Sequence, residues 1–208
     1  MKVLAIGAHF DDCEIGCGGT LAKHRANGDE VLILVITNSQ YHDHYGKLIR
    51  DADVALKEGQ NAAKILNCKL TCLDYPTKEV KFDHKLIADV ERIIDEQETD
   101  LIYTHWDNDV HQDHQAIAKA TFPAGRKVNN ILMYQSNMYM STKTFSPNFY
   151  VDISNFFEIK MQSILAHENE VKKFGPGWLK FWENEAVNSG QKFNVKYAEQ
   201  FQLVKYLI

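Results

Sequence analysis

The 208-residue sequence has no apolar run that approaches the roughly 20 residues needed to cross a lipid bilayer. It also has no recognisable signal peptide, because its first residues lead directly into an apolar, strand-like pattern. Basic residues are fewer than acidic ones, 23 against 28, and the net charge of −5 argues against a nucleic-acid or anionic-membrane partner. We therefore expect a cytoplasmic protein without a membrane span.

Cysteine and proline are scarce, with four of each. No CxxC pair occurs among Cys13, Cys17, Cys68 and Cys72, so we expect free thiols rather than a disulfide framework. Cys13 and Cys17 could bind a metal, but packing at the start of a helix is the simpler expectation. There is no linker, repeat or low-complexity segment, and the length favours a single domain over residues 1–208.

Apolar, β-branched stretches alternate with segments of helical periodicity along the first two-thirds of the chain. Strands are predicted at 2–7, 30–37, 69–73, 101–104 and 130–135, and helices at 16–27, 48–66, 83–98 and 113–122. This alternation predicts a mostly parallel sheet with helices on both faces, a Rossmann-like three-layer α/β sandwich. The last third predicts an edge strand at 149–153 and helices at 156–174 and 178–187, which would close one side of a site.

Directly after the first predicted strand, four side chains that can bind a metal or a proton lie within six positions: His9, Asp11, Asp12 and Glu14. In an open α/β sheet, ligands bind outside the carboxyl ends of the strands. The GCGGT segment that follows lacks the GxGxxG spacing of a dinucleotide site, which leaves a nucleotide-binding oxidoreductase as a weak alternative. Elemental analysis for a bound metal separates the two interpretations.

A second cluster, HWDNDVHQDH at 105–114, follows the fourth predicted strand and holds three histidines and three aspartates. Because the first and fourth strands end at the same edge of a parallel sheet, we expect the two clusters to meet there. His105 itself either lines the rim of the site or only ends the strand. Two such clusters at equivalent strand ends favour a functional site over solvated, helix-capping loops.

These residue types suit a catalytic zinc ion, which takes three protein ligands and keeps one position for water. His9, one of Asp11 or Asp12, and a histidine of the second cluster would supply the ligands. The remaining carboxylate could act as general base, and a further histidine could protonate the leaving group or stabilise an oxyanion. Asp113 could orient an imidazole from behind.

The segments HFDDCE at 9–14 and GCGGTL at 16–21 resemble the AHPDDE motif of the LmbE-like (PIG-L) family of zinc-dependent N-acetylglucosamine deacetylases. The segment DVHQDH at 109–114 resembles the second motif of that family, HxDH. Further similarity at 145–148, 151–153 and 198–201 extends the resemblance over nearly the whole chain. It implies a hydrolase that removes the acetyl group from a small N-acetylated amino sugar or its conjugate.

The resemblance also implies a role for each residue of the two motifs. The metal ligands would be His9, Asp12 and His114, and the catalytic residues would be Asp11, His111 and Asp113. In this assignment Asp11 is the general base, His111 is the acid or the oxyanion partner, and Asp113 orients His111. The implied metal is Zn²⁺, with another divalent ion such as Fe²⁺ as an alternative.

Three departures from the family pattern concern the loop and the substrate. In one of them, His167 is followed by Glu168-Asn169 where the family often has Ser-Gln. Phe10 replaces the usual proline of the first motif without removing a ligand. The family arginine that contacts substrate has no clear counterpart, because its position corresponds to Ala55, and Arg50 is the nearest candidate. Two further alternatives therefore stay open: hydrolysis of a non-sugar or thiol-sugar amide, and a non-hydrolytic metal-binding module.

The remaining aromatic and imidazole side chains carry weaker expectations. Trp106, Tyr134 and Tyr139 could line a sugar pocket, with structural packing at least as good an interpretation. The Trp178/Trp182 pair is expected in the core or an interface. Surface positions are expected for His24, His42, His44 and His84. Exposed aromatic residues in the last third favour a homo-oligomer.

Overall fold

A seven-stranded sheet runs through the computed structural model, which describes residues 1–207. Its strands lie in the order β5-β2-β1-β6-β7-β9-β8. Their bounds are β1 Lys2–Gly7, β2 Glu30–Thr37, β5 Lys69–Tyr75, β6 Leu101–His105, β7 Asn130–Tyr134, β8 Phe149–Asp152 and β9 Ala198–Lys205. The pairs among β5, β2, β1, β6 and β7 are parallel, and β9 runs antiparallel to both β7 and β8.

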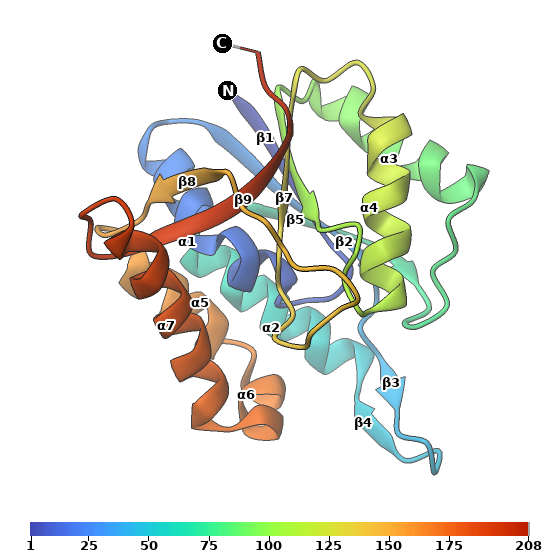
Figure 1. Ribbon diagram of the computed structural model, residues 1–208. Coiled ribbons are helices and arrows are strands. Elements are labelled where there is room, and N and C mark those ends of the chain that lie inside the picture. Colours follow the sequence, from blue (N-terminus) through green and yellow to red (C-terminus); the bar gives the residue numbers. More distant parts are fainter. Residues whose placement is uncertain (208) are drawn as a thin grey trace.

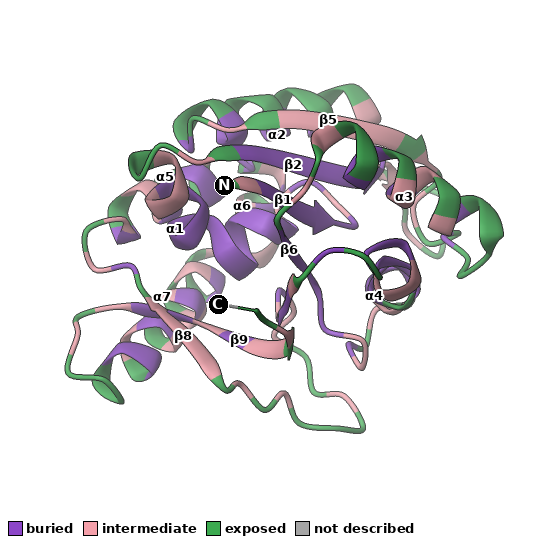
Figure 2. Cartoon of the chain, turned by 90° about the horizontal axis from the view of Figure 1, so that it is seen from above, coloured by how far each residue is buried: buried purple, intermediate pink, exposed green. Residues whose placement is uncertain are grey.

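Alternating side chains of the central strand β1 point into two separate apolar cores. Val3 and Ala5 face one core, and Leu4 and Ile6 face the other, as the two-residue period of a strand requires. Helices α1 Asp12–Ala26, α2 Ala52–Ile65 and α5 Phe157–Leu165 cover the first face, and α3 His84–Gln97 and α4 Gln112–Ala124 cover the second (Figure 1). Figure 2 shows the buried strands between these two layers. The predicted three-layer α/β sandwich is confirmed.

The first helix begins earlier than the sequence predicted. Helix α1 starts at Asp12 rather than at residue 16, so the glycine-rich segment lies inside the helix and not before it. A Cβ atom on Gly16 would come within 2.1 Å of Cδ2 of Tyr134, so glycine is needed there for close helix–strand packing. The amino terminus of the helix, with its partial positive charge, therefore lies at Asp11 and Asp12 themselves.

Two other predicted helices differ from the structure. Residues 48–50 form strand β4 Leu48–Arg50, which pairs with β3 Tyr41–His42 in a hairpin that projects at the bottom of Figure 1. Helix α2 starts only after Asp51, whose carboxylate accepts the N–H groups of Asp53 and Val54. The predicted helix 156–174 is two helices, α5 and α6 Glu168–Phe174, because the chain leaves helical geometry at the buried His167.

The carboxyl-terminal segment completes the sheet and one wall of the site. Helix α7 spans Pro176–Gln191, longer than the predicted 178–187, and strand β9 was not predicted. Cys13 and Cys17 are free and packed in the core beneath α1, as expected, and Cys68 and Cys72 are free as well. Within residues 1–207, the helices are all too short or too polar to cross a membrane.

Candidate active site

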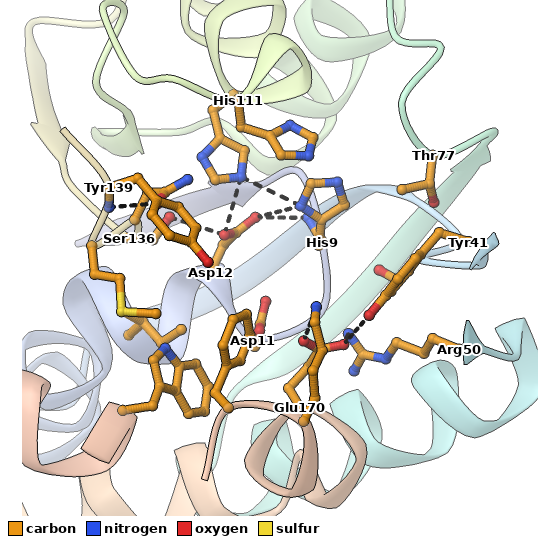
Figure 3. Close-up of a pocket in the computed structure, with 18 of the residues that line it drawn as sticks. His9, Asp11, Asp12, Tyr41, Arg50, Thr77, His111, Ser136, Tyr139 and Glu170 are labelled. Atoms are coloured by element: carbon orange, nitrogen blue, oxygen red, sulfur yellow. Dashed lines mark hydrogen bonds and ion pairs between the residues drawn. The ribbon is translucent and has the colours of Figure 1, made fainter. Parts of the chain in front are cut away.

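A cavity of about 300 Å³ opens at the carboxyl edge of the sheet, where the loops after β1, β2, β6 and β7 meet helices α6 and α7. Residues from both sequence clusters line it, together with polar and aromatic groups from the other loops (Figure 3). The lining includes His9, Asp11, Asp12, Tyr41, Arg50, Lys78, His111, His114, Ser136, Tyr139, Glu170 and Trp178. The two clusters therefore converge as predicted.

The three residues predicted as metal ligands present their donor atoms to one point. Nδ1 of His9 lies 3.4 Å from Nε2 of His114. The two oxygens of Asp12 lie 3.4 Å from Nε2 of His114 and 3.5 Å from Nδ1 of His9. Metal bonds of about 2.0–2.1 Å in a tetrahedral zinc site place the ligands about 3.3 Å apart. The donor types and their spacing therefore fit a tetrahedral divalent ion.

A carboxylate lies behind each of the two histidines of this group. Oδ2 of Asp113 is 3.0 Å from Nε2 of His9, and Oδ2 of Asp109 is 3.2 Å from Nδ1 of His114. Such pairs fix the ring orientation and leave the other nitrogen free for a metal. In this structure the Asp113 carboxylate also accepts the N–H groups of Lys78 and Val80, and its side-chain contact is with His9, whereas the resemblance implied His111.

The backbone of the first-motif loop is held from several sides. The N–H of Ala8 donates to Nε2 of His105, and the N–H of Phe10 donates to Oγ of Ser39. The guanidinium of Arg50 donates to the carbonyl of Phe10. These bonds hold Asp11 at φ 125°, a strained backbone for a residue with a side chain. Strain of this kind persists where surrounding contacts over-determine it, typically at functional sites.

The departure at Phe10 has a structural reason. Its ring is buried against Gly59 of α2, where an added Cβ would come within 2.2 Å of the phenyl ring. Its N–H makes the hydrogen bond to Ser39 that a proline could not donate. Phe10 therefore anchors the loop to α2, and the neighbouring carboxylates remain in the cavity.

Asp11 and His111 face the cavity without belonging to the central donor group. Burial, together with the adjacent carboxylate of Asp12, raises the pKa of Asp11 to about 7. His111 is the N-cap of α4, and its Nδ1 accepts the backbone N–H of Asp113. Burial, and then the neighbouring imidazoles of His9 and His114, lower the pKa of His111 to about 4. A neutral His111 therefore carries its proton on Nε2 and can donate a hydrogen bond.

Arg50, the candidate for substrate contact, lies in the cavity wall, but both of its terminal nitrogens already contact other groups of the chain. It donates to Phe10 and to Oε2 of Glu58 at 3.0 Å each, and it lies 3.7 Å from Glu170. Its side chain is only 2% exposed. Ala55, the position that corresponds to the family arginine, is fully buried in the core beneath α2. Arg50 therefore supports the motif loop directly.

The predictions for the remaining aromatic and histidine side chains are met in part. Tyr139 and Trp178 line the cavity, whereas Tyr134 is fully buried against α1, and Trp106 is buried without lining the cavity. His42, His44 and His84 are exposed as expected. The surface prediction for His24 is wrong, because both of its ring nitrogens are hydrogen-bonded, to Asp29 and to Tyr103.

Three residues that contact the predicted ligands had no assigned role in the sequence analysis, although His105 was considered for the rim of the site. His105 is fully buried with its Nε2 3.3 Å from Asp12, Asp109 lies behind His114, and Ser136 donates to Oδ1 of Asp12 at 2.9 Å. His105 and Asp109 lie within the recognised cluster, so their position there was a usable signal. Nothing local marked Ser136, which reaches the site only because β7 lies next to β6.

The sequence profile of one protein family, described as PIG-L: GlcNAc-PI de-N-acetylase, matches residues 4–124. The chain belongs to the PIG-L family. Its N-deacetylase class, predicted from the two motifs, is thereby confirmed.

Other proteins similar to this PIG-L member extend the match. A protein of Escherichia coli (strain K12) named uncharacterized deacetylase YaiS is 31% identical over 176 residues, covering 80% of this chain and 90% of that protein. The diacetylchitobiose deacetylase of Thermococcus kodakarensis is 25% identical and covers 98% of this chain and 83% of that protein. The fold also matches the crystal structure of the conserved protein TT1542 from Thermus thermophilus, with a TM-score of 0.86, 22% identity, and coverage of 100% and 96% of the two chains.

Proposed function

We propose that this PIG-L protein is a zinc-dependent hydrolase that removes the N-acetyl group from an N-acetylated amino sugar or its conjugate. The observation that carries this proposal is the convergence of His9, Asp12 and His114 on one point, with the carboxylate of Asp11 beside them in the same cavity. This arrangement supplies a metal site and a separate base, which hydrolysis of an amide requires.

A second group of side chains, His9, His111 and Asp113, also lies close enough to share an ion. Its carboxylate already accepts two backbone N–H groups and lies 3.0 Å from Nε2 of His9. The first group is the better metal site, because its histidines each keep one nitrogen free while the other faces a carboxylate. Nitrogen and oxygen ligands of this kind suit Zn²⁺, and they also suit Fe²⁺.

A divalent ion held by these residues would polarise the acetamide carbonyl and acidify a bound water. The chain supplies the proton transfers. Asp11, with a pKa near neutrality, takes a proton from the attacking water as its oxygen bonds to the carbonyl carbon. Nε2–H of His111 donates a hydrogen bond to the oxyanion that forms. The proton held by Asp11 then passes to the amide nitrogen as the C–N bond breaks, which gives acetate and a free amine.

This sequence of steps favours one of the two roles implied for His111. Its pKa of about 4 keeps the ring neutral near pH 7, so it acts as a hydrogen-bond donor rather than as a stored acid. In this proposal Asp113 does not contact the substrate and instead orients the ring of His9.

The proposed substrate class rests on the relatives and on the cavity. One relative is named for diacetylchitobiose, an N-acetylated sugar. Tyr139 is 57% exposed at the cavity and Trp178 lines another wall, and such rings stack on the apolar faces of sugars. The volume of about 300 Å³ suits a small ligand.

Acetate release from purified, zinc-loaded protein tests the proposal. We expect acetate and free amine in equal amounts from N-acetylglucosamine or N,N′-diacetylchitobiose, and little from a non-sugar N-acetyl amine. A chelator should abolish the release and added Zn²⁺ should restore it. If the protein hydrolysed only the non-sugar amide or a thiol-sugar amide, the proposed substrate class would be wrong. Metal binding without hydrolysis of any amide would favour a non-hydrolytic module.

Three further predictions belong to this proposal. The residues 1–208 would act as a single deacetylase domain, since strands from Lys2 to Lys205 pair in one sheet. The four free thiols are typical of a reducing compartment such as the cytoplasm. Self-association stays a prediction. It would use exposed aromatic residues of the last third, such as Phe193 and Tyr206, and the molecular mass of the protein in solution would test it.

A further inference from the structure

We propose that His105 and Ser136 are positioning residues that fix the carboxylate of Asp12 for metal binding through a one-way chain of hydrogen bonds. The inference rests on the proposed function, because it assigns a purpose to groups behind the proposed ligand. Neither residue belongs to the two motifs, and they come from the ends of neighbouring strands, β6 and β7. Figure 3 shows Asp12 between Ser136 and His9.

The direction of the chain is set by the backbone. The N–H of Ala8 donates to Nε2 of His105 at 2.9 Å, so this nitrogen is an acceptor and the neutral ring carries its proton on Nδ1. Nδ1 faces Oγ of Ser136 at 3.5 Å, whereas the unprotonated Nε2 lies 3.3 Å from Oδ2 of Asp12 and has no proton to donate to it. The hydroxyl of Ser136 in turn donates to Oδ1 of Asp12 at 2.9 Å. Because the serine accepts from the imidazole, its own proton is directed to the carboxylate.

The carboxylate of Asp12 is thereby held at both oxygens before any ion binds. Oδ1 accepts from Ser136, and Oδ2 accepts the backbone N–H of His9 at 2.8 Å. These two bonds restrict rotation of the carboxylate, so that both oxygens keep their distances to the ligand nitrogens of His9 and His114. The whole chain is shielded from water, with exposures of 0% for His105, 3% for Asp12 and 8% for Ser136. Hydrogen bonds in such surroundings restrain a side chain more than they would in water.

A purely structural role predicts a different pattern of effects. Loss of a packing contact would lower the stability of the fold without acting selectively on the metal. Loss of a ligand's orienting bond typically weakens metal binding by about 10–100-fold. The buried hydroxyl of Thr104, adjacent to His105 and bonded to Thr121 at 3.1 Å outside the cavity, offers a matched control.

The test measures Zn²⁺ affinity by competition with a chromophoric chelator, in Ser136→Ala, Ser136→Thr and Thr104→Val. We expect about 10–100-fold weaker binding in Ser136→Ala, near-normal binding in Ser136→Thr, which keeps the hydroxyl, and unchanged binding in Thr104→Val. The Co²⁺-loaded Ser136→Ala protein should also show an altered visible absorption spectrum. Its kcat should fall by a larger factor than KM rises, because the Ser136 hydroxyl donates to the carboxylate of Asp12.

Two substitutions of His105 test the direction of the chain. Asn can place a donor near the position of Nδ1 and keep the bond to Ser136, whereas Gln can place an acceptor near Nε2 and keep only the bond from Ala8. We expect His105→Gln to weaken metal binding more than His105→Asn. Equal losses in the two variants would overturn the role of His105 as a donor to Ser136.

The outcomes separate this inference from the proposed function. If wild-type protein binds no metal and releases no acetate, the proposed function fails. If the wild type binds Zn²⁺ and Ser136→Ala binds it within twofold, the inference fails while the function stands. An equal loss of affinity in Ser136→Ala and Thr104→Val also overturns the inference, because it would reflect general loosening of the strand ends.

Discussion

Both ends of the central sheet hold a histidine paired with a carboxylate, but the two ends differ in how many ring nitrogens remain for a ligand. At the amino end, Nδ1 of His24 contacts Asp29 at 2.6 Å and Nε2 contacts the hydroxyl of Tyr103 at 3.0 Å. At the carboxyl end, His9 and His114 each direct one nitrogen to a carboxylate and the other to the same point. A histidine whose two nitrogens are both hydrogen-bonded has none left for a ligand, whereas the converging nitrogens of His9 and His114 could hold one ion.

The strongest test of this contrast removes one converging donor. We expect His114→Ala to lose Zn²⁺ and to lower kcat/KM by roughly 10⁴-fold or more, since a metal Lewis acid contributes several kcal/mol to transition-state stabilisation. Metal content by elemental analysis and acetate release measure the two effects. A variant that kept one equivalent of zinc would remove His114 from the ligand set.

The next test separates the base from the ligands. Asp11→Asn keeps the size of the side chain but cannot accept a proton, so we expect about 10³-fold lower kcat with zinc affinity close to that of the wild type. Chelator competition and acetate release from the same preparation give both values. Near-normal turnover would contradict the assignment of Asp11, and loss of zinc would make it a ligand.

A smaller effect is expected for the carboxylate behind His114. Asp109→Asn removes the negative charge 3.2 Å from Nδ1, and we expect zinc affinity to fall by about 10–100-fold. Chelator competition measures the change. Gln112→Ala, an exposed neighbour in the same segment, is the control and should bind zinc normally.

The smallest effect on activity is expected at the opposite end of the sheet. His24→Leu leaves the buried hydroxyl of Tyr103 without its partner, which costs about 1–3 kcal/mol of unfolding free energy. Urea denaturation measures this loss, and kcat/KM should stay unchanged. A fall in activity larger than the loss of folded protein would show that the two ends of the sheet are coupled.

Much of the site could be predicted from local sequence. The motif segments at 9–14 and 109–114 follow strands of a parallel sheet, and this alone indicates that the two clusters meet. The choice of His9, Asp12 and His114 within them came from the resemblance to the family. The partner of Asp113 was not predicted, because the family resemblance implied His111, while the fold brings His9 within 3.0 Å. The hairpin at 41–50 was also missed, since its short strands lack the apolar alternation of a longer one.

The sequence by itself determined the alternation of strands and helices in the parallel part of the sheet, the two clusters and the chemistry that their residue types can perform, because these depend on composition and spacing along the chain. Only the tertiary structure decided which donor atoms converge at the proposed metal site and which side chains hydrogen-bond to those donors from the far side. Ser136 and Asp12 are 124 residues apart, and their bond exists only because β7 packs beside β6 and β6 beside β1. Contacts across strands depend on sheet order and register, which no local pattern specifies.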